Sequence, residues 1–189
     1  AATDDLERLA RGLRGLLVVD EAYTDFADEN ALGLVSRHDN VMVLRTVSKG
    51  YSLAGLRLGF SVARPEVLAG LMKIKDSYNV DSVALRLGAA AMADQAWMSA
   101  NAGKVKAARA ELAGALEEMG FRVWPSQANF ILARPPQGDA RRLYEGLRER
   151  GILVRYWDRP RLADKMRISV GTPEENDMLL TALRQLLED

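Results

Sequence analysis

The sequence contains no cysteine and only one histidine among its 189 residues. The lack of cysteine excludes a disulfide scaffold, a thiolate metal site and a thiol nucleophile. A single histidine excludes a metal site built from several imidazoles, so we expect no metal. That histidine, His38, stands in a polar stretch before an apolar run, and we expect it to face solvent without a functional role.

Excess charge and long apolar runs are also missing. The 26 lysines and arginines balance the 26 aspartates and glutamates, which leaves no basic surface to attract nucleic acid or an anionic membrane. No run approaches the roughly 20 apolar residues of a membrane helix, and the charged first residues lack the apolar core of a signal peptide. We therefore expect a cytoplasmic protein with no nucleic-acid or membrane partner.

Three short apolar runs in the first half of the chain predict strands, at residues 16–19, 41–44 and 58–63. Uninterrupted apolar runs of this length are typical of strands buried on both faces, as in a mostly parallel α/β sheet. Pro65 favours the first turn of a helix. Residues 82–100 are rich in alanine, leucine and methionine and predict one long buried helix.

The character of the chain changes near residues 101–103, where a second domain is predicted to begin. Helices are expected at 104–119, 139–150 and 173–187, and strands at 121–124, 129–133, 152–156 and 166–170. This order predicts a small α+β domain over residues 101–189. Residues 1–100 have too few helices to cover both faces of a parallel sheet. We therefore expect them to be the C-terminal part of a larger domain, and the chain to be the C-terminal half of a longer protein.

Polar residues follow the first two predicted strands, where ligands of open α/β sheets gather. Asp20 and Tyr23 follow the first strand, Ser48 and Lys49 follow the second, and Arg57 lies in the next loop. Singly, each is better explained as a cap, a core aromatic, a loop residue or a surface charge. Together they would suit a cofactor with a basic ring nitrogen, a phenolic oxygen, an aldehyde and a phosphate.

The motif DEAY, followed further along by SKGYSLAGLRLG, resembles the fold-type I pyridoxal-phosphate aminotransferases. The segments VVDEAYTDF, LAGLRLGF and ILVRYWDRPRLADKMRISVGTPEEN are most similar to the histidinol-phosphate aminotransferases among them. The resemblance covers essentially the whole chain. It implies a homodimeric enzyme of histidine biosynthesis that transfers an amino group between histidinol phosphate and 2-oxoglutarate.

The resemblance also implies roles for the strand-end residues. Lys49 would hold pyridoxal 5′-phosphate covalently and then move a proton between substrate and cofactor. Asp20 would lie against the pyridine nitrogen, where a carboxylate keeps the ring protonated. Tyr23 would bond the phenolic oxygen of the ring. Ser48 and Arg57 would bind the cofactor phosphate, which suits the planar fork of an arginine.

Two arginines in the second half are implied substrate ligands. Strand alternation over residues 166–170 puts Arg167 on the face opposite Met166 and Ile168. Without the resemblance, Arg167 is equally well read as an edge-strand residue in water. With it, Arg167 would anchor the anionic end of the substrate, either a carboxylate or a phosphate. Arg155 would be the second arginine of the same substrate site.

Other functions remain open on the sequence alone. The chain could belong to another fold-type I aminotransferase, to a decarboxylase acting on a phosphorylated amino acid, or to a non-catalytic phosphate-binding module. No small-residue-rich turn into a helix precedes Asp20, although helix N-termini carry much of phosphate binding. We therefore predict that the isolated chain binds the cofactor weakly and is inactive.

Overall fold

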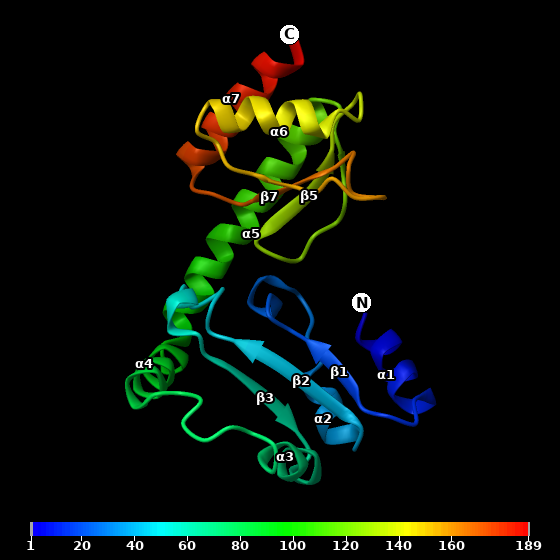
Figure 1. Ribbon diagram of the computed structural model, residues 1–189, viewed down its shortest axis with the longest axis vertical. Helices are drawn as coiled ribbons and strands as arrows, with labels where there is room; N and C mark the ends of the chain where they lie inside the picture. The colour runs from blue at the N-terminus through cyan, green and yellow to red at the C-terminus, as the bar shows by residue number, and fades with distance from the viewer. Residues whose placement is uncertain (1, 189) are drawn as a thin grey trace. The chain divides into compact units, whose positions relative to one another are not determined.

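A computed structural model describes residues 2–188. The chain divides into two compact units, unit 1 (Ala1–Ala102) and unit 2 (Gly103–Asp189) (Figure 1). Each unit has its own sheet and its own apolar core. None of the helices over residues 2–188 is long and apolar enough to cross a membrane.

Unit 1 is built on a three-stranded sheet in the order β1-β2-β3. Its strands are β1 (Leu17–Asp20), β2 (Val41–Thr46) and β3 (Gly59–Ala63), close to the three predicted runs. β1 and β2 are parallel and β2 and β3 are antiparallel, so the described sheet is mixed rather than mostly parallel. The predicted α/β class is confirmed.

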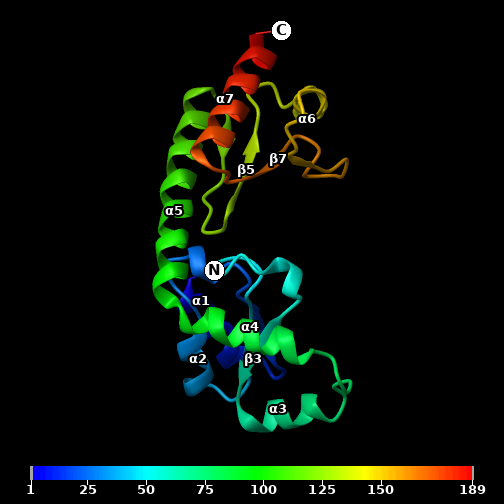
Figure 2. The same ribbon diagram turned by 90° about the vertical axis from the view of Figure 1, so that its left-hand side faces the viewer.

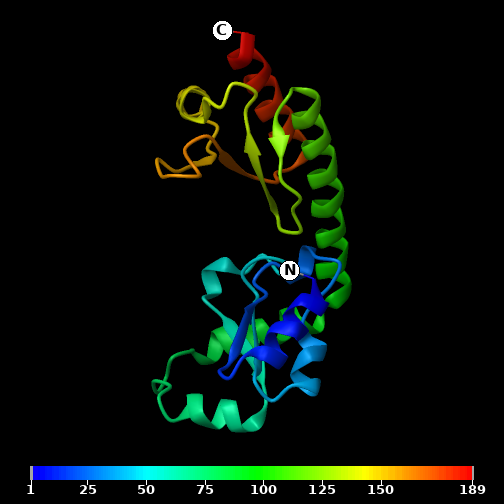
Figure 3. The same cartoon turned by 90° about the vertical axis from the view of Figure 1, so that its right-hand side faces the viewer.

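Two helices cover one face of this sheet. Helix α1 (Thr3–Gly12) and the short helix α2 (Leu32–Arg37) bury Ala10 and Leu34 against Val41 and Val43 of β2 (Figure 3). The sequence prediction missed α2, because six residues are too few to display a helical repeat. The remaining helical segments of unit 1 are the 3₁₀ turns η1 (Thr24–Phe26) and η2 (Ala54–Leu56), and helices α3 (Pro65–Met72) and α4 (Ser82–Ala93).

The predicted helix break near residues 101–103 is wrong. Helix α4 ends at Ala93, and one continuous helix, α5 (Gln95–Glu118), runs through that region. Asp94 makes the break, since its carboxylate accepts a hydrogen bond of 3.0 Å from the Trp97 backbone N–H. Aspartate is a favoured N-cap residue, whereas Gly103 inside a helix costs only about 1 kcal/mol. A local side-chain bond therefore outweighs the change in composition.

Unit 2 contains an antiparallel sheet in the order β4-β5-β7-β6. Its strands are β4 (Arg122–Val123), β5 (Phe130–Arg134), β6 (Arg155–Tyr156) and β7 (Met166–Ser169). Helix α7 (Pro173–Glu188) lies beside α5 on one face of the sheet (Figures 2 and 3), while α6 (Ala140–Glu149) packs against α7 and β6. One core of fifteen buried residues joins these elements.

The predicted starts of the last two helices, α6 and α7, are confirmed. The Asp139 carboxylate accepts a hydrogen bond of 3.1 Å from the Arg142 backbone N–H and caps α6. At the start of α7, the Thr172 backbone N–H donates to Glu175 (2.8 Å) and the Glu175 N–H donates to the Thr172 hydroxyl (3.3 Å). This reciprocal pair is a capping box, which fixes the first turn of the last helix.

Candidate active site

The strand register of unit 1 brings the predicted site residues to one edge of the sheet. β1 and β2 run parallel, with Asp20 opposite Leu44, so the segments that follow both strands leave at the same edge. β3 runs the other way, with its first residue, Gly59, opposite Thr46. Arg57, just before β3, therefore reaches the same edge as Asp20 and the Ser48–Lys49 dipeptide.

Asp20 is the last residue of β1 and its side chain is turned toward the edge of the sheet. One carboxylate oxygen accepts a hydrogen bond of 3.0 Å from the Ala22 backbone N–H, which bends the chain away from the strand. A carboxylate offers about four acceptor positions, so this single bond leaves most of them for a ligand. Asp20 is thus oriented by its own turn and remains exposed.

Lys49 and Tyr23 lie side by side. The Lys49 Nζ atom is 5.7 Å from the centroid of the Tyr23 ring, within the range of a cation–π contact. Both residues are partly buried. The two loops, one after β1 and one after β2, therefore present an amine and a phenol to the same space.

Ser48 is held by Thr46, a residue that the sequence analysis did not single out. The Thr46 hydroxyl oxygen accepts from the Ser48 backbone N–H (3.1 Å) and lies 2.8 Å from the Ser48 hydroxyl. It also bonds the Leu58 carbonyl at 2.9 Å, which joins the end of β2 to the residue before β3. The signal available in the sequence is a hydroxyl residue two positions before another, a spacing typical of a local side-chain turn.

The loop between β2 and β3 contains two non-glycine residues in the left-handed region. Ser52 has a φ of 57° and Arg57 has a φ of 55°. This conformation costs an L-residue about 1–2 kcal/mol. The Arg57 guanidinium is exposed and donates to the Ala54 carbonyl at 2.8 Å. Backbone strain of this kind concentrates at ligand sites, where the surroundings must hold it.

An ion pair between Glu21 and Arg45 ties the two parallel strands together at the site. Glu21 Oε2 accepts from Nε (3.0 Å) and from Nη2 (2.8 Å) of Arg45, and the Glu21 side chain is only 8% exposed. The other oxygen of Glu21 accepts from the Ala31 backbone N–H. Sequence reasoning gave neither residue a role. The available signal was a pair of opposite charges at the ends of two neighbouring strands.

Asp25 in the loop after β1 packs against Gly50 in the loop after β2. Gly50 is buried, and a Cβ atom on it would lie 2.6 Å from both Cβ and Cγ of Asp25. Burial raises the pKa of Asp25, although Arg45 and the Gly50 backbone N–H act in the opposite direction. Glycine is therefore required after Lys49, because any side chain would collide with Asp25.

Arg155 and Arg167 face each other across β6 and β7 of unit 2. The Arg167 guanidinium lies 5.0 Å from the Phe130 ring centroid and 5.7 Å from that of Trp157, while Arg155 lies 5.3 Å from Trp157. β7 is an inner strand, so the reading of Arg167 as an edge-strand residue is wrong. Within the described residues, its buried Nε atom has no hydrogen-bond partner.

The predicted environment of His38 is wrong. Its side chain is 15% exposed, and its Nε2 atom lies 3.3 Å from Glu7 Oε1. Glu7 also pairs with Arg11 at 2.7 Å and with Arg37 at 3.0 Å, so this group joins α1 to the end of α2. The sequence could not display this contact, since Glu7 and His38 are 31 positions apart.

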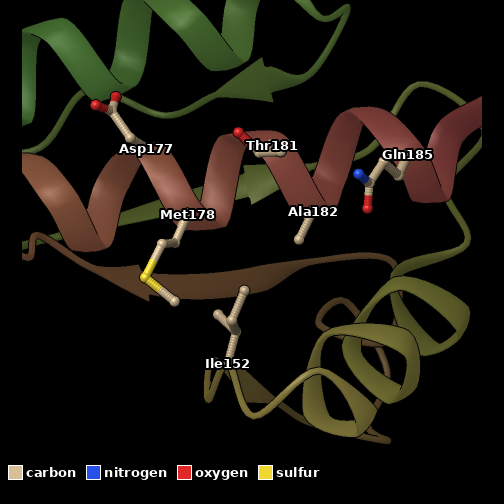
Figure 4. A pocket seen from close by; sticks show the side chains of 6 residues that line it. All are labelled: Ile152, Asp177, Met178, Thr181, Ala182 and Gln185. Carbon is tan, nitrogen blue, oxygen red and sulfur yellow. The ribbon is translucent and has the colours of Figure 1, made fainter.

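A shallow groove of about 370 Å³ lies on unit 2 between α7 and the segment after α6 (Figure 4). Met178 and Ala182 project from α7 toward Ile152, and Asp177, Thr181 and Gln185 complete the lining. None of the predicted site residues lines this groove. Residues 2–188 contain no group of three or more histidine, aspartate or glutamate side chains able to hold a metal ion.

Known proteins resemble the chain over almost its whole length. The family model described as "Aminotransferase class I and II" matches residues 1–183. Histidinol-phosphate aminotransferase 1 of Nostoc sp. is 59% identical over 186 residues, which are 98% of this chain and 53% of that protein. The chain thus spans about half the length of the curated relatives it matches.

Solved structures resemble the chain in the same way. Histidinol-phosphate aminotransferase from Sinorhizobium meliloti, in complex with pyridoxal-5′-phosphate, has a TM-score of 0.90 at 27% identity, over all of this chain and 53% of its own. L-threonine-O-3-phosphate decarboxylase from Porphyromonas gingivalis has a TM-score of 0.87 over all of this chain and 60% of its own, but at 23% identity it supports the fold alone. The chain belongs to the class I and II aminotransferases.

Proposed function

We propose that this chain is part of a histidinol-phosphate aminotransferase, which transfers an amino group between histidinol phosphate and 2-oxoglutarate to give imidazole-acetol phosphate and glutamate in histidine biosynthesis. The 59% identity to the Nostoc protein supports this substrate. The single observation that carries the chemistry is the Lys49 amine beside the Tyr23 phenol, at the sheet edge that also holds Asp20.

The donor set at this edge fits pyridoxal 5′-phosphate. When bound, this cofactor supplies an electron sink that stabilises negative charge on the substrate carbon. Asp20 offers a carboxylate with free acceptor positions to the protonated ring nitrogen. Tyr23 offers a phenol to the ring oxygen, and Lys49 offers the amine that the cofactor aldehyde requires.

Ser48 and Arg57 are the proposed ligands of the cofactor phosphate. They lie at opposite ends of the loop between β2 and β3, which the Thr46 hydroxyl closes. The exposed guanidinium of Arg57 has donors left after its one bond to the Ala54 carbonyl, and its planar fork suits a phosphate. Charge-assisted bonds to phosphate contribute about 1.5–3 kcal/mol each.

Lys49 is the proposed proton carrier. Its amine would move a proton between the substrate carbon and the cofactor carbon. The adjacent Tyr23 ring fixes the approach of the Nζ atom. A guanidinium at this position could not do so, since it stays protonated.

Arg155 and Arg167 are the proposed ligands of the anionic end of the substrate. Two like charges directly opposite on a sheet repel each other, and a bound anion removes that repulsion. The aromatic rings of Phe130 and Trp157 exclude water from the guanidinium of Arg167 and orient it. Either a carboxylate or a phosphate suits this pair.

The wider organisation is proposed on the same basis. Residues 1–100 would be part of the cofactor-binding domain and residues 101–189 the small domain of a cytoplasmic homodimer. Because the chain spans 53% of its Nostoc relative, further ligands of the cofactor would come from the rest of the protein. We expect the 189-residue chain alone to bind the cofactor weakly and to lack useful activity.

The test uses the full-length protein that contains this chain. Borohydride reduction followed by peptide mapping should label Lys49, and a substrate panel should give its highest kcat/KM with histidinol phosphate. A label on another lysine, or none, would overturn the assignment of the cofactor site. Preference for a different amino donor, or release of carbon dioxide, would favour another aminotransferase or a phosphoamino-acid decarboxylase. Full function of Lys49→Arg would favour a non-catalytic phosphate-binding module.

A further inference from the structure

Asp25 connects the loop that carries Tyr23 to the loop that carries Lys49. It lies in the 3₁₀ turn η1, whose N-cap residue is Tyr23. The Phe26 backbone N–H donates to the Tyr23 carbonyl at 3.1 Å, so Tyr23 and Asp25 belong to one hydrogen-bonded turn. The Asp25 side chain leaves this turn and packs on Gly50, the residue after Lys49.

The backbone of Gly50 packs tightly against the side chain of Asp25. Gly50 is buried, and there is no room for a Cβ atom between its Cα atom and the Asp25 side chain. The carbonyl of Lys49 accepts a hydrogen bond of 3.0 Å from the Ser52 backbone N–H, which closes a turn around Gly50. Movement of Asp25 would therefore shift the turn that begins at Lys49.

Burial raises the pKa of Asp25, and the charges around it act in both directions. Arg45 and the Gly50 backbone N–H stabilise its ionised form, whereas its own burial and the nearby Glu21 oppose ionisation. Arg45 is itself held by the bonds of 2.8 and 3.0 Å to Glu21. Asp25 thus packs on the backbone that carries Lys49 and lies in the field of Arg45, which Glu21 holds in place.

We propose that Asp25 is a positioning residue, which holds the Lys49–Gly50 backbone against the η1 turn and so sets the direction of the Lys49 amine toward Tyr23. The proposal rests on the proposed function of Lys49. Asp25 acts through Gly50 rather than on the cofactor. It accounts for the proximity of Lys49 and Tyr23, which stand on separate loops with no sequence constraint between them.

The experiment compares four variants of the full-length enzyme. Asp25→Ala removes the contact, Gly50→Ala forces it apart without changing any charge, and Asp39→Ala removes an exposed carboxylate elsewhere in unit 1 as the matched control. Asp25→Asn keeps the shape of the side chain and an oxygen that can accept from Gly50. Circular dichroism and thermal melting select the variants that fold.

Steady-state kinetics and the absorbance of the bound cofactor as a function of pH are the first readouts. Misplacing the amine by about 1 Å should lower kcat by about 100-fold, with KM for both substrates changed much less. Asp25→Ala and Gly50→Ala should both do this and shift the pH at which the cofactor spectrum changes. Asp25→Asn should restore most of kcat, and Asp39→Ala should resemble the parent.

The second readout needs no cofactor. The rate at which an amine-directed acylating reagent modifies Lys49 is measured by peptide mass spectrometry in the cofactor-free protein. Asp25→Ala and Gly50→Ala should change that rate several-fold, and Asp39→Ala should not. If the parent protein binds no cofactor but the labelling rates still change, the proposed function fails and the positioning role stands. Unchanged kinetics, spectra and labelling in folded Asp25→Ala would overturn the positioning role.

Discussion

Units 1 and 2 differ sharply in how completely each buries its apolar side chains. Unit 2 joins fifteen buried residues in one core, whereas the core of unit 1 has six. In the described part of the chain, unit 2 exposes two large apolar side chains, Leu153 and Met178. Unit 1 exposes fourteen: Leu9, Leu13, Leu16, Val18, Leu32, Leu71, Met72, Ile74, Tyr78, Val83, Leu85, Leu87, Met92 and Trp97.

The exposed side chains of unit 1 are concentrated in α3, α4 and the segment between them. Ile74 is 82% exposed and Tyr78 is 99% exposed. Large exposed apolar side chains so close together in the sequence are typical of surface that other polypeptide covers. Unit 2 closes its core with its own residues, while unit 1 leaves many large apolar side chains uncovered.

The largest expected effect tests whether the chemistry resides in unit 1. In the full-length enzyme, Lys49→Arg should lower kcat by about 10²- to 10⁴-fold, because a guanidinium cannot carry the proton. Lys73→Arg, at the end of α3, is the matched control and should leave kcat unchanged. Single-turnover kinetics with histidinol phosphate measure the difference. Retention of kcat in Lys49→Arg would remove unit 1 as the catalytic unit.

The next effect compares a buried side chain of unit 2 with an exposed side chain of unit 1. Leu183 is fully buried in unit 2, so Leu183→Ala should reduce the free energy of unfolding by about 2–5 kcal/mol. Ile74→Ala removes a side chain of similar size from exposed surface in unit 1 and should change it by less than about 0.5 kcal/mol in this chain. Urea unfolding followed by circular dichroism measures both. Equal losses would contradict the difference in packing.

A smaller effect separates backbone strain from ligand binding at Arg57. Both Arg57→Ala and Arg57→Gly should weaken cofactor binding by the same amount, about 1.5–3 kcal/mol, because both remove the guanidinium. Only glycine relieves the left-handed φ of 55°, so Arg57→Gly should be about 1 kcal/mol more stable than Arg57→Ala. Cofactor titration and thermal melting give the two quantities. Equal stability of the variants would argue against strain at this residue.

The smallest effect concerns acid stability in unit 1. Burial disfavours the Glu7 carboxylate, but hydrogen bonds from His38 and Arg11 and the charge of Arg37 outweigh it and lower the pKa of Glu7. Its contribution is therefore present above the ordinary pKa of a glutamate and is lost as the pH falls through the lower folded value. Glu7→Gln should flatten this acid branch in a series of urea melts between neutral and acid pH. Parallel curves for the two proteins would refute the linkage.

The elements that could be predicted from the sequence are those with a local signal. Apolar runs indicated the three strands of unit 1, and Thr172 and Glu175 indicated the start of α7. The order of the strands also allowed us to predict that Asp20, Lys49 and Arg57 meet at one edge of the sheet. The strand register of the structure agrees with this placement.

The elements that could not be predicted depend on partners far apart in the chain. The Glu21–Arg45 pair, the packing of Asp25 on Gly50 and the contact of His38 with Glu7 each join segments at least 24 positions apart. The break at Asp94 was missed for a different reason, because one side-chain hydrogen bond overrode the helical propensity of its neighbours. Composition and periodicity carry neither kind of information.

Anions that bind the facing arginines of unit 2 should stabilise that unit against unfolding. Arg155 and Arg167 sit directly across from each other on neighbouring strands, and Arg167 is partly enclosed by aromatic rings. A species that neutralises both guanidinium groups in the folded state, and finds no such pair in the unfolded one, must raise the melting temperature. An anionic substrate that binds these two side chains as proposed should therefore also protect the protein against thermal unfolding.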